Sequence, residues 1–321
     1  MERAGEGGFR RADRRIYRLG VNARAPLIRT ADGTNRGSFT SAEWSMLGFL
    51  ALVWGSSFFL IAVGLTAFTP GMVAWLRLMV AVLVLSCFPA VRAKVERSDW
   101  PAIAIVAVAG NAGPALLFAH AEQTVESAVA GMLNASVPLM TAAIAFGLGV
   151  RTLRRVHVVG LLIGLAGVVL LSLPSGTGSA AAGVVMVLFA VLGYALTNNV
   201  LVPLAQRYGA LPVIYRAQLL SVALVAPFGL TGLSDNRLAW GPLVAVVVLG
   251  ALGTGLARSV QANMVGRVGA PRASIIGYLV PVVAIVLGVV FLGETLDVFE
   301  LAGFALVLAS ASMLTRAVRS G

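Results

Sequence analysis

Long apolar runs without charge recur along this chain and constrain its fold more than any other feature. From Ser45 onward they come at a steady pitch, separated by short segments that contain Pro, Gly, Ser or charged residues. About 20 apolar residues cross a bilayer as one helix. The sequence therefore predicts an all-α membrane protein with ten transmembrane helices, at about residues 45–66, 72–91, 101–120, 127–148, 156–174, 181–203, 212–231, 240–259, 273–292 and 298–315.

The composition excludes a soluble enzyme with one buried core. Of 321 residues, 59% are hydrophobic and 12% are charged, whereas soluble domains are roughly half apolar and a quarter charged. The single cysteine, Cys87, excludes an internal disulfide framework and a thiol-metal site. The sequence has no G-x-x-x-x-G-K-[ST] loop and no H-E-x-x-H motif. We therefore expect no metal, no cofactor and no enzymatic activity.

An intramembrane hydrolase is the enzymatic alternative, with Ser56 or Ser57 as nucleophile and His120 as base. Such a pair must lie within hydrogen-bonding distance. The serines fall near the middle of the first predicted span and His120 at the outer end of the third, which argues against this reading.

The basic residues define an orientation. The net charge of +11 would suggest nucleic-acid binding in a soluble protein. With the N-terminus inside, however, 22 of the 24 basic residues face the cytoplasm and one, Arg237, faces outward. This asymmetry predicts cytoplasmic N- and C-termini in a cell inner membrane with anionic lipid, and no nucleic-acid partner. The inner set comprises nine arginines before residue 37 and Arg92, Lys94, Arg97, Arg151, Arg154, Arg155, Arg207, Arg216, Arg258, Arg267, Arg272, Arg316 and Arg319.

Residues 1–42 differ from the rest of the chain. They contain those nine arginines and no sustained apolar period, which is typical of a disordered basic tail. No small-residue cleavage site follows a short apolar segment, so we expect the first span to remain as an anchor.

The chain also contains an internal repeat. Residues 128–140 align with residues 271–283 at an offset of 143, and the run Trp100–Gly110 matches the run Trp240–Gly250. The repeat predicts two sets of helices.

Each set contains five predicted spans, the first at residues 45–174 and the second at 181–315. Because five is odd, the second set must have the opposite orientation in the bilayer. Inverted repeats are typical of secondary transporters, whose substrate site lies between the halves near the bilayer midplane.

Pro138 and Pro281 occupy corresponding positions in the middle of two spans. Each proline removes one backbone hydrogen bond and displaces the carbonyl four residues earlier, at Asn134 or Gly277. Since that carbonyl needs a partner within a membrane, we expect helix breaks that line a cavity. A packed kink is the alternative.

Arg77 is the only basic residue deep within a predicted span, about six residues or ~9 Å from its outer end. Burying an unpaired guanidinium group costs at least about 2.5–3.5 kcal/mol. Arg77 must therefore face a cavity, a partner or a substrate anion. The alternative is a structural arginine that binds carbonyls and extends toward the surface.

Further polar side chains lie within the apolar spans at similar depth. A few polar groups on apolar walls suit a small-molecule site, although Ser and Asn also join helices to each other. The candidate substrate-binding residues are Trp54, Ser56, Ser57, Arg77, Asn111, Asn134, Tyr194, Asn198, Gln218 and Tyr278, with Asn199 beside them.

Acidic residues lie only in the tail, in connections and at span ends. A proton-coupled pump for organic cations needs a carboxylate within the membrane, so a neutral, zwitterionic or anionic substrate is expected. A proton-coupled multidrug efflux pump stays open as an alternative if Glu122 or Glu294 carries the proton.

Several segments together resemble the drug/metabolite transporter superfamily, specifically its EamA-type members. They are WGSSFF at residues 54–59, WLRLMVAVLVL around Arg77, the Pro138 segment leading to GLLIGLAGVVLL from Gly160, PVVAIVLGVVFLGETL at residues 281–296 and GFALVLAS from Gly303. The resemblance covers residues 45–316. It implies ten helices with cytoplasmic termini, a cavity between the first four helices of each half, and the fifth helices at the periphery or in a dimer interface.

The resemblance also implies transport, often export, of amino acids or other small metabolites. One residue departs from the family pattern: Arg151 follows the fourth span, where the family often has a glutamate, as Glu294 follows the ninth. We therefore expect a secondary-active exporter of amino acids or related zwitterionic or anionic solutes that works by alternating access, with a homodimer possible in principle. A non-transport membrane scaffold or sensor is the remaining alternative.

Overall fold

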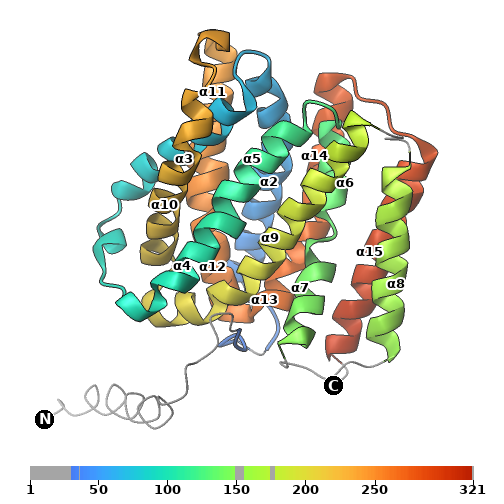
Figure 1. Cartoon of the computed structure of the whole chain (residues 1–321). Coiled ribbons are helices and arrows are strands. Elements are labelled where there is room, and N and C mark those ends of the chain that lie inside the picture. Colours follow the sequence, from blue (N-terminus) through green and yellow to red (C-terminus); the bar gives the residue numbers. More distant parts are fainter. Residues whose placement is uncertain (1–29, 36, 149–154, 174–177, 320–321) are drawn as a thin grey trace, which may run out of the picture.

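The computed structural model describes residues 30–35, 37–148, 155–173 and 178–319, and this part of the chain is a bundle of helices without strands (Figure 1). Within it, seven helical segments are long and apolar enough to cross a membrane. They are Ser41–Leu65, Arg97–Ala121, Ser127–Gly147, Ser179–Tyr208, Ala210–Leu230, Trp240–Val268 and Ala270–Leu292. Shorter apolar helices lie at Pro70–Ser86, Leu162–Leu171 and Val298–Ser310. Ten membrane crossings and the inverted orientation of the halves remain predictions.

Several of these segments consist of consecutive helices. In chain order the main elements are α2 (Ser41–Leu65), α3 (Pro70–Ser86), α4 (Trp100–Ala107), η3 (Val108–Ala112), α5 (Gly113–Ala121), α6 (Ser127–Asn134), α7 (Val137–Gly147), α8 (Arg155–Ser172), α9 (Ser179–Tyr208), α10 (Ala210–Leu230), α11 (Trp240–Val248), η5 (Leu249–Leu256), α12 (Ala257–Val268), α13 (Ala270–Ala273), η6 (Ser274–Tyr278), α14 (Val280–Leu287), η7 (Gly288–Leu292) and α15 (Val298–Arg319). Short 3₁₀ turns lie at Pro89–Arg92, Arg97–Asp99 and Leu233–Asp235.

Local sequence signals set the helix ends. Thr40 and Glu43 form a capping box at the start of α2, which satisfies two amides that a helix N-terminus leaves free. Thr69 caps α3, and Pro70 occupies its first position, where the missing amide is not needed. Gly209 ends α9 with a φ of 79°, a left-handed conformation that glycine adopts without strain.

Two wider π-helical turns, η3 and η5, interrupt the third and eighth spans. They begin eight residues after Trp100 and nine after Trp240, so they occupy matching places in the sequence repeat. A π-helical turn changes the backbone hydrogen-bonding pattern and is frequent at functional sites.

The helices that contain Pro138 and Pro281 are both interrupted just before the proline. α6 ends at Asn134 and α7 begins at Val137, while the 3₁₀ turn η6 precedes α14, which begins at Val280. The two interruptions pack against each other, because a Cβ atom on Gly277 would lie 2.8 Å from Pro138 Cδ. The breaks of the two halves thus meet at one point of the bundle.

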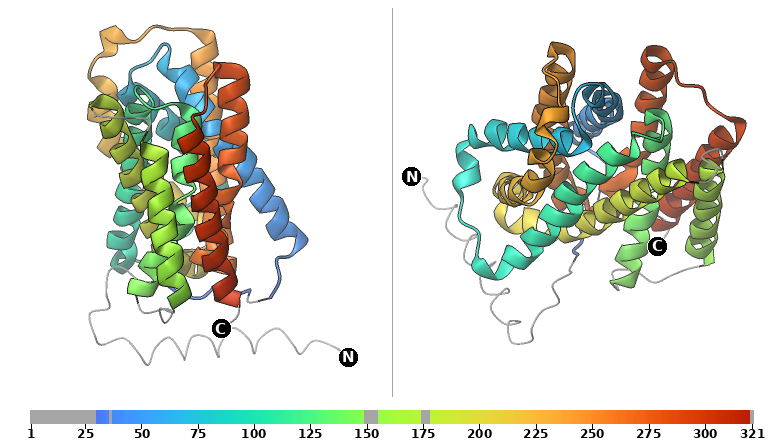
Figure 2. Two further views of the ribbon diagram at one scale, coloured as in Figure 1. Left: turned by 90° about the vertical axis from the view of Figure 1, so that its right-hand side faces the viewer. Right: turned by 45° about the horizontal axis from the view of Figure 1, so that its top comes forward.

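α8 and α15 form a pair beside the other helices (Figures 1 and 2). Glycines bring their backbones together: a Cβ atom on Gly303 would lie 2.6 Å from the Leu171 nitrogen and 2.7 Å from the Gly167 carbonyl oxygen. Ser310 Oγ also donates to the Gly160 carbonyl oxygen at 2.6 Å. Close approach through small residues is the usual way in which helices pack in lipid.

The segment before α2 differs from the prediction of a disordered tail through residue 42. Residues 30–35 and 37–40 lie across the ends of α9 and α12, and α2 already begins at Ser41. The Asn35 amide donates to the Arg267 carbonyl at 2.7 Å, and Gln206 Nε2 donates to the Asp32 carbonyl at 2.7 Å. The helix ends provide acceptors that composition alone does not reveal. Residues 1–29 and 36 lie outside the described part.

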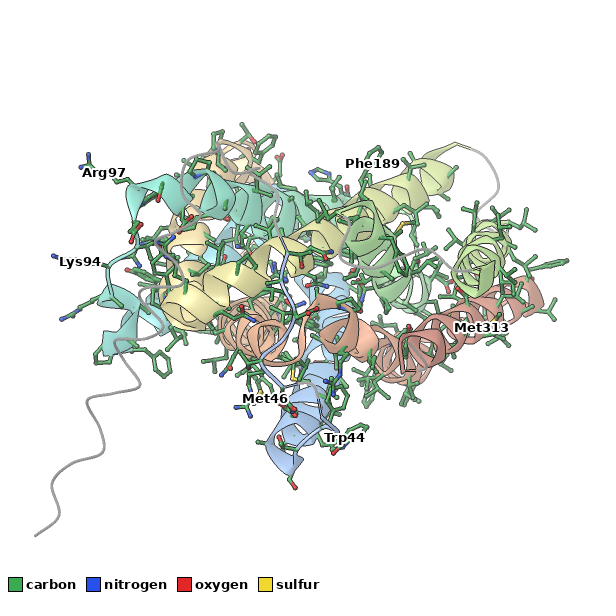
Figure 3. All side chains as sticks on the ribbon, turned by 90° about the horizontal axis from the view of Figure 1, so that it is seen from below. Trp44, Met46, Lys94, Arg97, Phe189 and Met313 are labelled. Atoms are coloured by element: carbon green, nitrogen blue, oxygen red, sulfur yellow. The ribbon has the colours of Figure 1, made fainter. Side chains whose placement is uncertain are left out.

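Exposed aromatic and basic side chains mark the lower end of the bundle. Seen from below, Trp44 and Met46 project from the start of α2, while Lys94 and Arg97 extend from the connection between α3 and α4 (Figure 3). Tryptophan and basic residues favour the interface between lipid and water. This end therefore suits a membrane surface.

Replacing Gly303 by Ala should destabilise the protein by about 1–3 kcal/mol, because the added methyl group overpacks the contact with α8. Thermal unfolding in detergent should show a lower Tm. Gly48→Ala is the matched control, since Gly48 also lies within a helix but a Cβ atom there meets no atom within 4 Å. A Tm for Gly303→Ala equal to that of Gly48→Ala would contradict the close contact.

Candidate functional site

A cavity lies between the two halves, around the helix breaks and the π-helical turns. It contains about 770 Å³ of space without protein atoms, part of it open to solvent. The lining residues are Trp54, Ser57, Phe58, Ile61, Arg77, Gly110, Asn111, Ala115, Phe118, Asn134, Val137, Tyr194, Asn198, Gly253, Thr254, Arg258, Gln261, Ile276, Gly277 and Val280.

Arg77 on α3 enters this cavity with its guanidinium group only partly bound. The residue is 7% exposed, and its Nε donates to Thr254 Oγ1 on η5 at 2.8 Å. Within the described part of the chain, neither Nη1 nor Nη2 has a hydrogen-bond partner. Since a guanidinium group offers its Nη hydrogens as a planar fork, Arg77 presents an unused binding edge.

Arg258 on α12 is buried to a similar degree, at 5% exposure, but all of its nitrogens are bound. Nε donates to Asn111 Oδ1 at 3.1 Å, Nη1 to Gln261 Oε1 at 2.7 Å and Nη2 to the Gly110 carbonyl oxygen at 2.6 Å. Its guanidinium carbon also lies 5.2 Å from the centre of the Tyr194 ring. Neutral dipoles and an aromatic face therefore hold this cation.

The two arginines connect the halves reciprocally. Arg77 belongs to the first half and binds η5 of the second, whereas Arg258 belongs to the second half and binds η3 of the first. The approach of Arg258 depends on Gly110, because a Cβ atom there would lie 2.6 Å from Nη2. The π-helical turns thus supply the contacts that fix both cations.

A chain of side-chain amides continues from Arg258 into α9 and α7. Gln261 Nε2 donates to Asn198 Oδ1 at 2.5 Å, and Asn198 Nδ2 donates to Thr141 Oγ1 at 3.3 Å. Asn199 Nδ2 donates to the Thr141 carbonyl oxygen at 3.2 Å. These bonds orient Gln261 toward Arg258 and tie three helices together.

Aromatic rings form one wall of the cavity. Phe118 stacks on Tyr194 at a centroid distance of 6.0 Å and meets Phe58 edge-on at 5.4 Å. On another side, Trp54 Nε1 donates to the Gly253 carbonyl oxygen at 3.0 Å. The walls are therefore apolar and firmly held, as expected for an organic ligand.

The charges of the site are unbalanced. Two guanidinium groups line the cavity, and none of the described lining residues is an acid. Among the described lining residues, two amide atoms are buried without a partner, Asn111 Nδ2 and Asn134 Oδ1. The two cations, together with the unused donors of Arg77 and Asn111, favour an anionic group, whereas Asn134 Oδ1 is an unused acceptor.

Glu294, in the second half, binds the first half. Its Oε1 accepts from the Ser127 amide at 2.7 Å and its Oε2 from the Ala128 amide at 2.9 Å. These are the first residues of α6, where the helix dipole stabilises a negative charge. Glu294 therefore caps the broken helix of the other half.

The structure brings together most of the candidate residues from the sequence but not all. Trp54, Ser57, Arg77, Asn111, Asn134, Tyr194 and Asn198 line one cavity. Ser56 does not, because its hydroxyl donates to the Leu52 and Val53 carbonyl oxygens of its own helix. Gln218 is buried behind the cavity and donates to the Thr254 carbonyl oxygen at 2.9 Å. Tyr278 lies on η6 outside the lining.

Sequence reasoning missed Arg258, Thr254 and Gln261, and its assignment of Arg258 to a cytoplasmic connection is wrong. The span begins at Trp240 and continues to Val268 rather than ending near residue 259. Arg258 and Gln261, two of the polar residues after Leu256, line the cavity and do not end the helix. The sequence repeat indicates the same correction. Arg258 lies 18 residues after Trp240, and its counterpart in the first copy, Phe118, lies 18 residues after Trp100, within the predicted span 101–120.

Arg151, which replaces the glutamate of the family pattern, lies outside the described residues.

Comparison with known proteins gives consistent results. The model of the EamA-like transporter family matches residues 43–173 and again residues 181–316. The chain is 26% identical over 276 residues to the uncharacterised inner membrane transporter YedA of Escherichia coli strain K12, covering 83% of this chain and 88% of YedA.

A second relative is the probable terminal-alkyne amino-acid exporter of Streptantibioticus cattleyicolor, which is 24% identical over 282 residues, 86% of this chain and 94% of the exporter. A solved crystal structure with 21% identity has the same fold, with a TM-score of 0.65 over 88% of this chain and 99% of the other.

Charge-conserving substitutions should separate the two arginines. Arg258→Lys removes at least two charge-assisted hydrogen bonds, each worth about 1.5–3 kcal/mol, whereas Arg77→Lys removes at most one. Thermal unfolding should show a loss of stability at least about twice as large for Arg258→Lys. An equal or larger loss for Arg77→Lys would contradict the contacts described above.

Proposed function

This chain belongs to the EamA-like transporter family, and on that premise we propose that it is a secondary-active transporter of small carboxylate-bearing solutes, amino acids above all. Its helices make it a multi-pass membrane protein, and its relatives are named as transporters. The family fixes the general activity, while the substrate class rests on the chemistry of the cavity.

The observation that carries the proposal is the unused edge of Arg77. Both Nη atoms lack a partner in the described structure, and the residue is nine-tenths buried. A carboxylate matches such an edge with two parallel hydrogen bonds. Because the described lining holds no acid that competes for the group, a substrate carboxylate is the natural partner.

The helix breaks supply acceptors for the other end of an amino acid. Asn134 Oδ1 is buried without a partner and lines the cavity. The break before Pro138 also leaves the Asn134 carbonyl oxygen without its usual intrahelical donor. Such acceptors suit an ammonium group, so the site fits a zwitterion. The relative named as a probable amino-acid exporter supports the same substrate class.

Cations without a carboxylate are poor candidates for the same site. A cationic drug would meet Arg77 and Arg258 with no acidic side chain among the described lining residues. Like charges in a poorly solvated cavity repel strongly. The charge balance therefore favours amino-acid transport over multidrug efflux.

Alternating access would use the same contacts. In this proposal the two halves are inverted repeats with ten membrane crossings, and they rock around the cavity at the Pro138 and Pro281 breaks.

Basic residues cluster at the same end of the bundle as the start of α2: Arg267 pairs with Glu43 at 3.3 Å, and Arg207 pairs with Asp99 at 2.8 Å. By the positive-inside rule we propose that this end faces the cytoplasm, with export as the proposed direction.

Arg77→Gln should reduce transport at least about tenfold, because it removes the charge that binds the carboxylate. The assay uses proteoliposomes loaded with an equimolar mixture of the twenty L-amino acids and measures each amino acid released. The variant should still fold, since only one hydrogen bond is lost.

Arg237→Gln is the matched control, because it makes the same chemical change at an exposed position outside the cavity. It should transport like the wild type. Release of no amino acid by the wild type above protein-free vesicles, or undiminished release by Arg77→Gln, would contradict the proposal.

A further inference from the structure

The carboxyl group of Glu122 is buried and interacts electrostatically with Arg77, although Glu122 lies outside the cavity lining. Glu122 directly follows α5, and its amide donates to the Phe118 carbonyl oxygen at 2.9 Å. Both carboxyl oxygens are buried, and neither has a hydrogen-bond partner in the described part of the chain. An ionised carboxylate without hydrogen bonds is very unfavourable away from water, so this geometry fits the protonated form.

The charged groups around Glu122 come from three directions. α3 contributes Arg77, the segment after η7 contributes Glu294, and Glu126 lies exposed four residues further along. α9 presents Tyr194, His120 stands two residues earlier, and the only ionisable residue of α2, Glu43, lies at its far end. Arg77 is therefore the cation on which an ionised Glu122 depends.

Glu294 is already occupied by the two backbone amides of α6. Its position therefore suits the anion, whereas the position of Glu122 suits the acid. Burial raises the pKa of the Glu122 carboxyl well above its ordinary value, and the negative charge of Glu294 acts in the same direction, while Arg77 opposes both.

Arg77 links this group to the substrate site. A carboxylate bound to Arg77 neutralises the cation that would otherwise favour ionised Glu122, so anion binding favours protonation of Glu122. By reciprocity, protonation of Glu122 leaves the charge of Arg77 free and strengthens anion binding. Binding of a proton to Glu122 and binding of a carboxylate to Arg77 should therefore strengthen each other.

We propose that Glu122 is a proton-binding site coupled to the anion site at Arg77, so that one proton and one carboxylate solute cross the membrane in the same direction. In export, the outward gradient of the solute then drives transport and carries the proton out with it. This inference rests on the proposed function and adds the coupling ion. Affinity for the solute should rise as the pH falls, until Glu122 is fully protonated.

Infrared spectroscopy of the full-length protein in nanodiscs tests the proton site directly, because protonated carboxyl groups absorb apart from carboxylates. A protonated carboxyl band should persist at pH values where an exposed carboxyl group is already ionised, be absent from Glu122→Gln and remain in Asp235→Asn, an exposed control. The equimolar mixture of L-amino acids should move the titration midpoint of this band to higher pH, and Arg77→Gln should abolish that movement.

The outcomes separate this inference from the proposed function. Two results would overturn the coupling alone. One is a protonated carboxyl band that remains in Glu122→Gln. The other is a titration midpoint that amino acids do not change, although the same preparation transports them. A shifted midpoint without transport supports the coupled site and contradicts the transport proposal. Because the midpoint is measured on the unmodified protein, the test holds even if Glu122→Gln fails to fold.

A vesicle assay provides the functional counterpart. Efflux of amino acids from vesicles that contain a pH-sensitive dye should make the interior more alkaline in the wild type. Glu122→Gln, which mimics the protonated side chain permanently, should show efflux without the pH change. An equal pH change in this variant would contradict the proposal.

Discussion

Two guanidinium groups buried inside an apolar helical bundle impose the constraint on which the rest of the structure depends. An uncompensated cation at this depth would oppose insertion, and the described lining residues offer no carboxylate. The protein meets the constraint with dipoles from η3 and η5, each of which binds the arginine of the opposite half. The π-helical turns, the glycines beside them and the amide chain through α9 all serve this arrangement.

The same contacts give the two arginines different roles. Arg258 uses every nitrogen to bind the protein, so it fixes the halves relative to each other. Arg77 uses only Nε, so its remaining edge is available to a solute carboxylate. Because the charge of Arg77 also reaches Glu122, the electrostatics that select an anion can also bind a proton. In the proposed mechanism, substrate class and energy coupling have one physical origin.

The sequence predicts part of this design. A lone arginine flanked by apolar residues identifies Arg77, and the repeated prolines identify the two helix breaks, because both features are costly in lipid unless protein surrounds them. Periodicity does not fix the rotation of a helix that is apolar on all sides. It therefore could not separate Ser57, which lines the cavity, from Ser56, which does not. The sequence did not identify Arg258 as a buried residue, because the partners that make its burial tolerable, Gly110 and Asn111, lie in a distant segment of the chain, η3.

A structure determined with a transported amino acid bound tests the central claim most directly. The account predicts the ligand carboxylate within hydrogen-bonding distance of Arg77 Nη1 and Nη2, with the contacts of Arg258 to Gly110, Asn111 and Gln261 unchanged. A ligand whose carboxylate displaces those contacts and binds Arg258, or that leaves the edge of Arg77 unoccupied, would contradict it.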